Sequence, residues 1–281
     1  MRVLVTGFNG QLGFDIIKRL ERLGIECRGV DIQDFDLTRE TDVMEYIRSY
    51  QPDIVVHCAA FTAVDRAEDE KELCYAVNVT GTENIARACR EVEARLMYFS
   101  TDYVFNGEGE QAFEIDDQHG ARSYYGLTKA MGETKVAEFV ERHFIVRISW
   151  VFGINGSNFV KTMLRLGREK SEVSVVADQI GSPTYTRDLA VLVCDMLQTD
   201  KYGLYHATNE GYCSWFEFAV AIFEQAGLDC VVRPVTSEQY PTKAVRPKNS
   251  RLSKDSLDRA EFERLPAWRD ALARYLVELG E

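Results

Sequence analysis

The sequence predicts a doubly wound α/β fold, in which helices cover both faces of a parallel sheet. Over the first two-thirds of the chain, short apolar runs alternate with helical segments. A glycine-rich turn directly follows the first apolar run. The runs are apolar almost throughout, which is typical of strands that are buried on both faces. These three observations together favour a parallel sheet with crossover helices.

The expected elements of this fold follow one another in a regular order. Strands are expected at 3–5, 27–31, 54–58, 96–100 and 144–148, and helices at 12–23, 42–50, 78–92 and 124–140. In the first helix, Leu12, Ile16, Leu20 and Leu23 recur with the helical period. One more strand is expected between the second strand and Asp36.

After about residue 150 the pattern changes and indicates a second, smaller domain. Helices are expected at 158–168, 187–197, 214–226 and 268–279, and strands at 173–176 and 202–207. We therefore expect residues 1–152 and 186–208 to form a dinucleotide-binding Rossmann domain. Residues 153–185 and 209–281 would form a smaller, mostly helical substrate domain, in which Trp215 packs as a core residue.

Composition excludes several kinds of function. The formal net charge of −12 would repel a phosphate backbone, so nucleic acid is not an expected partner. No apolar run is long enough to span a bilayer, and the N-terminus resembles a buried strand rather than a signal peptide, so we expect a cytoplasmic protein with no membrane partner. The seven cysteines form no CxxC pair, which argues against a disulfide framework or a zinc site.

The glycine turn Gly7-Phe8-Asn9-Gly10-Gln11-Leu12-Gly13 lies between the first strand and the first helix. Glycines in this position permit a tight turn and the close approach of a pyrophosphate, which the helix N-terminus then attracts. The alternative is a tight turn with no ligand. The sequence predicts dinucleotide binding by Gly7, Asn9, Gly10, Gln11, Leu12, Asp31, Asp36, Leu37, Cys58, Ala59 and Ala60.

Asp31 ends the second strand and indicates the cofactor preference. A carboxylate at this position accepts a hydrogen bond from the ribose 2′-hydroxyl and repels a 2′-phosphate. No Arg or Lys follows within the next three residues. We therefore expect NADH to be used at least as well as NADPH, unless Asp31 only caps the turn.

Tyr125 and Lys129 form the candidate catalytic pair, with Thr101 at the end of a strand. Side chains four apart lie on one face of a helix, and a lysine cation beside a phenol is expected to lower the pKa of the phenol. Tyr125 would then act as an acid or base, and Thr101 would donate a hydrogen bond to a substrate carbonyl. Tyr124 is a weaker candidate, because the residue four positions later is Thr128. An accidental surface pair is the alternative.

With these motifs the chain resembles the extended short-chain dehydrogenases, and within them the dTDP-4-dehydrorhamnose reductase family. The resemblance covers nearly the whole chain. The matching stretches are 7–13, 59–68, 78–79, 100–105, Tyr125 with Lys129, 147–153, 158–160, 178–184, and 246–247 with 249–250. It implies that a nicotinamide cofactor reduces the 4-keto group of a nucleotide-linked 6-deoxysugar.

The resemblance also implies roles for particular residues. Tyr125 would supply the proton, Lys129 would hold the nicotinamide ribose, and Thr101 would polarise the carbonyl. Thr62 and Asn78 join the expected cofactor site. The expected substrate contacts are Thr101, Asp102, Tyr103, Tyr125, Trp150, Asn158 and Arg246.

Some members of this family are magnesium-linked dimers built on glutamates. This chain has Asp15 at one of the corresponding positions, so we expect no essential metal and leave monomer and homodimer open. A dehydratase or epimerase on the same scaffold is the nearest alternative, but Asp102 is followed by Tyr103 and not by the glutamate of the dehydratases. A non-catalytic NAD(P)-binding regulatory subunit is the other alternative.

Overall fold

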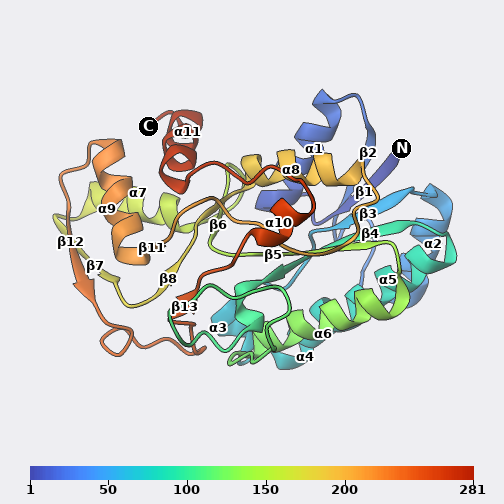
Figure 1. The fold of residues 1–281 in the computed structure, drawn as a ribbon, viewed down its shortest axis with the longest axis horizontal. Helices are drawn as coiled ribbons and strands as arrows, with labels where there is room; N and C mark the ends of the chain where they lie inside the picture. Colours follow the sequence, from blue (N-terminus) through green and yellow to red (C-terminus); the bar gives the residue numbers. More distant parts are fainter.

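A six-stranded parallel sheet forms the centre of the computed structural model, which describes all 281 residues (Figure 1). Its strands are β1 (Arg2–Thr6), β2 (Glu26–Val30), β3 (Ile54–His57), β4 (Arg95–Thr101), β5 (His143–Ile148) and β10 (Gly203–His206). Their order is β10-β5-β4-β3-β1-β2, and every neighbouring pair is parallel. The predicted doubly wound fold is confirmed, with the reversal of strand order between β1 and β3.

Helices cover both faces of this sheet. In Figure 1, α1 (Gln11–Arg22) and α8 (Thr186–Leu197) lie above it, and α2 (Glu40–Tyr50), α5 (Thr82–Glu91) and α6 (Tyr124–Phe139) lie below it. Successive strand side chains point to opposite faces. Accordingly, Val3 and Val5 pack with α1 and α8, while Leu4 packs with the helices of the other face.

The strand that we expected before Asp36 is absent, so that prediction was wrong. The chain turns at the edge of the sheet, where the Asp34 amide donates to the Asp31 carbonyl. The Asp36 carboxylate then accepts hydrogen bonds from the amide and hydroxyl of Thr38. Side-chain bonds of this kind favour turns over strand pairing, and β2 is therefore the last strand at this edge.

The smaller part of the molecule lies at one end of the sheet (left in Figure 1). It contains α7 (Phe159–Glu169), α9 (Trp215–Ala226) and α11 (Trp268–Leu279), beside the strands β7 (Glu172–Val176) and β12 (Val231–Val235). Five two-residue strands complete it: β6 (Val151–Phe152), β8 (Ile180–Gly181), β9 (Thr184–Tyr185), β11 (Cys213–Ser214) and β13 (Asn249–Ser250). These short strands and β12 carry too little periodicity for the sequence to have indicated them.

The short helix α10 (Asp255–Arg259) belongs to the packing of the larger sheet. Leu257, Phe262 and Leu265 pack with α8 and β10 in the hydrophobic core above the sheet. The domain boundaries at 153, 186 and 209 stay predictions. None of the helices combines the length and the apolar character needed to cross a membrane.

Candidate active site

A cavity of about 740 Å³ lies at the carboxyl ends of the central strands. It begins at the reversal between β1 and β3, which is where open α/β sheets bind ligands. Its walls come from the β1–α1 turn, the ends of β2, β3, β4 and β5, the helix α6, and Trp215 of α9. Segments far apart in the sequence therefore meet around one site.

The glycine turn forms one end of this cavity. Gly7 has φ +66°, and a Cβ there would lie 2.7 Å from the Cα of Ala59. A Cβ at Gly13 would lie 2.5 Å from the Gly7 carbonyl oxygen. Gly10 precedes α1 without a side-chain cap, so the first helical N–H groups stay available to an anion. The turn therefore has the form of a phosphate cradle.

Asp31 lies on the same wall, at the end of β2. Its carboxylate accepts hydrogen bonds from the Asn9 amide (3.3 Å) and the Ile32 amide (2.9 Å). Among all the residues that line the cavity, Lys129 is the only cation. No lining arginine or second lysine is present to receive a ribose 2′-phosphate.

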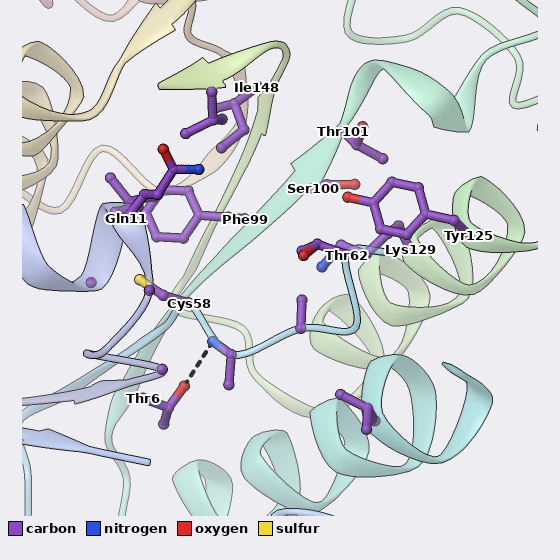
Figure 2. Close-up of a pocket in the computed structure, with 18 of the residues that line it drawn as sticks. Thr6, Gln11, Cys58, Thr62, Phe99, Ser100, Thr101, Tyr125, Lys129 and Ile148 are labelled. Carbon is purple, nitrogen blue, oxygen red and sulfur yellow. Dashed lines mark hydrogen bonds between the residues drawn. The ribbon is translucent and has the colours of Figure 1, made fainter. Parts of the chain in front are cut away.

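Tyr125 and Lys129 lie on the buried face of α6, opposite the end of β4. Ser123 caps the start of this helix by accepting a hydrogen bond from the Gly126 amide, so Tyr125 lies in the first turn. Figure 2 shows the Tyr125 hydroxyl pointing toward Ser100 and Thr101, with Lys129 behind it. The Lys129 ammonium lies 4.0 Å above the centre of the Tyr98 ring. The structure therefore brings the three predicted catalytic residues together.

The pKa of Tyr125 differs from the sequence-based expectation. Burial, followed by the nearby charge of Asp102, raises this pKa above its usual value. Burial also lowers the pKa of Lys129 to about 7, which weakens its effect as a cation. The expectation that Lys129 lowers the pKa of Tyr125 was therefore wrong, because desolvation dominates at this depth. A raised pKa keeps Tyr125 protonated, as a proton donor must be.

Asp102 shares this end of the cavity with Thr101. One carboxylate oxygen accepts a hydrogen bond from the Thr101 hydroxyl (2.9 Å), and the other is buried without a partner. Burial raises the pKa of Asp102 to about 6. Thr101 also accepts a hydrogen bond from the Tyr103 amide (3.3 Å). That second oxygen of Asp102 is shielded from solvent, and the Ser250 hydroxyl lies beside it.

A buried ion pair supports α6 two turns after Tyr125. Arg147 of β5 makes a bidentate contact with Glu133, at 2.8 and 2.7 Å. Both side chains are almost fully buried. Arg147 also donates to the Ile115 carbonyl and contacts His119, so the loop before α6 is tied to the sheet.

Asn78 lies behind the cavity and does not line it. It belongs to a π-helical turn, Ala76–Gly81, a form that is frequent near functional sites. Its amide accepts from the Phe61 amide (2.8 Å) and donates to the Phe61 carbonyl and the Thr128 hydroxyl (both 3.1 Å). Asn78 therefore connects the loop after β3 with α6.

Three other predicted site residues also lie outside the cavity lining. Asn9 contributes its amide to Asp31, as described above. Asn158 caps α7 and donates to Gln11 (3.0 Å), so its amide is already hydrogen-bonded within the protein. Arg246 lines a second cavity of about 730 Å³ and contacts Asp65 and the Tyr103 hydroxyl. Since Tyr103 lines the first cavity, this side-chain contact lies between the two cavities.

The remaining predicted residues do line the first cavity. They are Gly7, Gly10, Gln11, Leu12, Asp31, Asp36, Leu37, Cys58, Ala59, Ala60, Thr62, Thr101, Asp102, Tyr103, Tyr125, Lys129 and Trp150.

Several lining residues were missed from the sequence. Ser100 contributes a buried hydroxyl without a hydrogen-bond partner. Phe99 and Ile148 lie near the carboxyl ends of β4 and β5, each two residues before a predicted residue, and this position could have indicated them. Trp215 packs in the smaller part as expected, but it also lines the cavity, because tertiary packing brings α9 there.

Asp15, at the position considered for a metal, is buried in α1. Burial raises the pKa of its carboxyl, and the Thr186 hydroxyl donates a hydrogen bond to it. Within the chain, no group of three or more His, Cys, Asp or Glu side chains is arranged to hold a metal ion.

An open parallel sheet, a glycine phosphate cradle and a Thr-Tyr-Lys set around one cavity define an NAD(P)-dependent oxidoreductase of the extended short-chain dehydrogenase type. Residues 1–280 match the family described as RmlD substrate binding domain, and the chain belongs to this family.

Known relatives agree with this assignment. The chain is 42% identical over 277 residues to the spore coat polysaccharide biosynthesis protein SpsK of Bacillus subtilis, which covers 99% of this chain and 97% of the relative. The crystal structure of a dTDP-4-dehydrorhamnose reductase from Clostridium acetobutylicum has a TM-score of 0.98 and 40% identity, covering 100% of both chains. The Bacillus anthracis dTDP-4-dehydrorhamnose reductase in complex with NADP has a TM-score of 0.96 and 42% identity, covering 99% of both chains.

Proposed function

We propose that this protein uses NADH or NADPH to reduce the 4-keto group of dTDP-4-dehydro-L-rhamnose, giving dTDP-L-rhamnose. One observation carries the proposal: Thr101, Tyr125 and Lys129 converge in a cavity that continues into the glycine cradle. The names of the similar reductases support the choice of substrate.

The residues present fit a dinucleotide. A Cβ at Gly7 or Gly13 would fill the cradle, and the uncapped start of α1 offers N–H groups to a pyrophosphate. Asp31 would accept from the adenosine ribose, and Lys129 would donate to the nicotinamide ribose. When bound, the reduced nicotinamide supplies a hydride.

Tyr125 provides the acid for this reaction. Its hydroxyl points toward Ser100 and Thr101, so a carbonyl oxygen placed there would receive the phenol proton (Figure 2). Thr101 would donate to the same oxygen once its hydroxyl turns away from Asp102. Asp102 would accept a hydrogen bond from a sugar hydroxyl at the carboxylate oxygen that the Thr101 hydroxyl then leaves.

The remainder of the substrate extends toward the second cavity. Tyr103 and Trp150 line the first cavity beside the proposed position of the sugar. Arg246 offers a guanidinium between the two cavities, where it would approach a diphosphate. Asn158 would act here only by orienting Gln11.

The direct test is to incubate the protein with dTDP-4-dehydro-L-rhamnose and NADPH and to identify the product by NMR. Formation of dTDP-L-rhamnose with stoichiometric cofactor oxidation is expected. Release of a 4-keto sugar from dTDP-glucose would instead indicate a dehydratase. Tight cofactor binding without turnover of any keto sugar would indicate a regulatory subunit.

The cofactor preference can be changed at Asp31. Asp31→Ser removes the charge that repels a 2′-phosphate, and we expect the NADPH:NADH ratio of kcat/KM to rise about tenfold or more. Steady-state kinetics with both cofactors measures this ratio. Asp53→Ser is the matched control, because Asp53 lies at the amino end of β3, away from the cavity. An unchanged ratio in Asp31→Ser would contradict this role.

The pH dependence should reflect Lys129. Since its pKa is about 7, its positive charge is present below that pH and is lost as pH rises. We expect kcat/KM for the keto sugar to fall above about pH 7. In Lys129→Arg the group stays charged, so the descending limb should move to higher pH. If kcat/KM fell at the same pH in both proteins, the fall would have to come from the titration of another group.

A further inference from the structure

Trp150 and Trp215 form a stacked pair at the cavity. Their ring centres are 3.7 Å apart and the ring planes differ by 15°. Both line the cavity, yet Trp150 follows β5 in the larger sheet and Trp215 begins α9 in the smaller part. The stack therefore joins the two parts of the molecule at the site.

Trp150 has an unfavourable backbone conformation. Its φ is +49°, in the left-handed region that a bulky side chain rarely adopts. Such conformations cost free energy and persist only where their surroundings hold them. The Trp150 carbonyl accepts a hydrogen bond from the Thr184 amide (3.1 Å), which fixes the backbone on the C-terminal side of Trp150.

The residues around the Trp150 indole leave room for the ring. A Cβ at Gly181 would lie 2.8 Å from Cε2 of Trp150, so only glycine allows the ring to occupy this position. Gly181 pairs with Cys213 between β8 and β11, and Trp215 follows directly after β11. The pairing of β8 with β11 therefore positions both Gly181 and Trp215 against the Trp150 ring.

Trp215 is itself held firmly. It is the first residue of α9, and a capping box between Ser214 and Glu217 fixes this helix start. Phe159 of α7 packs against its ring with centres 4.6 Å apart. Trp215 is therefore a rigid support, anchored from the smaller part of the molecule.

We infer that Trp215 is a positioning residue for the keto sugar: by stacking on Trp150 it holds that indole, in its unfavourable backbone conformation, as the wall of the sugar site. This inference rests on the proposed function. Without Trp215 the Trp150 backbone can relax, and the substrate must then restore the wall when it binds. Weaker substrate binding follows, with little change in the chemical step.

The experiment combines kinetics with circular dichroism. In Trp215→Ala we expect KM for the keto sugar to rise about tenfold, as loss of an aromatic pair allows, with kcat and NADPH affinity little changed. Trp215→Phe keeps an aromatic face and should restore most of the affinity. Trp215→Leu keeps apolar volume without the ring and should not. Equal recovery by Phe and Leu would overturn the inference in favour of simple space filling.

The spectroscopic measurement does not depend on turnover. Two stacked indoles give an exciton couplet in the far-ultraviolet spectrum, which should disappear in both Trp150→Phe and Trp215→Phe. The chain has three tryptophans, so Trp268→Phe is the matched control and should keep the couplet. Trp268 packs against Phe218 and does not line the cavity. Absence of the couplet from the wild type would refute the stack.

The two proposals fail in different ways. A wild-type protein that does not reduce the keto sugar refutes the proposed function, and with it the assignment of this wall to the sugar. Wild-type turnover with an unchanged KM in Trp215→Ala refutes the inference alone.

Discussion

Replacing Tyr125 with Phe should lower kcat for keto-sugar reduction by about 10²–10⁴-fold, the range expected when a positioned proton donor is removed. The change deletes only the hydroxyl that points toward Ser100 and Thr101. The ring should keep its edge-to-face contact with Tyr103, whose ring centre is 5.7 Å away. Cofactor affinity, measured by fluorescence titration with NADPH, should therefore change little.

Tyr124→Phe is the matched control for this prediction. Tyr124 is the adjacent tyrosine of the same helix, and it does not line the cavity. Its kcat should stay close to the wild-type value. If Tyr125→Phe kept full activity, the proton would have to come from another group, and the binding-subunit alternative would also need reconsideration.

Breaking the ion pair between Arg147 and Glu133 should have the largest effect on stability. Arg147→Met leaves the Glu133 carboxylate buried without its partner, and such changes cost about 3–5 kcal/mol of unfolding free energy. Urea denaturation of the two proteins measures the difference. The double variant Arg147→Met with Glu133→Leu should recover much of the loss, because the uncompensated charge is then removed.

The exposed pair of Arg165 and Glu169 provides the comparison. Arg165→Ala should cost no more than about 1 kcal/mol, since solvent already screens both charges. A cost below about 1 kcal/mol for Arg147→Met would mean that the buried pair does not stabilise the fold in this way.

The same ion pair should make stability depend on pH. Burial alone would raise the pKa of Glu133, but hydrogen bonds from Arg147 and His119 outweigh it and lower this pKa to about 2. A carboxyl whose pKa is lower in the folded state stabilises the protein above its unfolded pKa, and the effect is lost on acidification. The contribution of Glu133 should therefore be complete above about pH 4.5 and decline as pH falls toward 2.

Local sequence patterns were sufficient for much of the site. The turn from Gly7 to Gly13, the acid at Asp31 and the spacing of Tyr125 and Lys129 each follow from a strand end or a helical repeat. Carboxyl ends of parallel strands meet at one edge, so predicting the strands also predicted that these groups would converge. The structure places all of these groups around one cavity, apart from Asn9 and Phe8 within the turn.

The pKa values of the site depend on how deeply each group is buried, which cannot be read from the sequence. The i, i+4 spacing correctly placed Lys129 on the same helical face as Tyr125. The direction in which the pKa of Tyr125 shifts was set by burial instead. Lys129 is likewise weakened as a cation by desolvation. The charge of a neighbour acts over a few ångströms, whereas desolvation depends on everything packed around the group.

By itself the sequence determined the doubly wound sheet, the phosphate cradle and the catalytic set, because each rests on contacts between residues close along the chain or on the register of parallel strands. Only the tertiary structure decided what closes the site. The stack of Trp150 on Trp215 joins two segments more than 60 residues apart through the pairing of β8 with β11. The turn after β2, where a strand was expected, was likewise decided by hydrogen bonds to Asp31 and Asp36. Non-local packing of this kind leaves no periodic signal in the sequence, since it depends on which surfaces meet after the elements have formed.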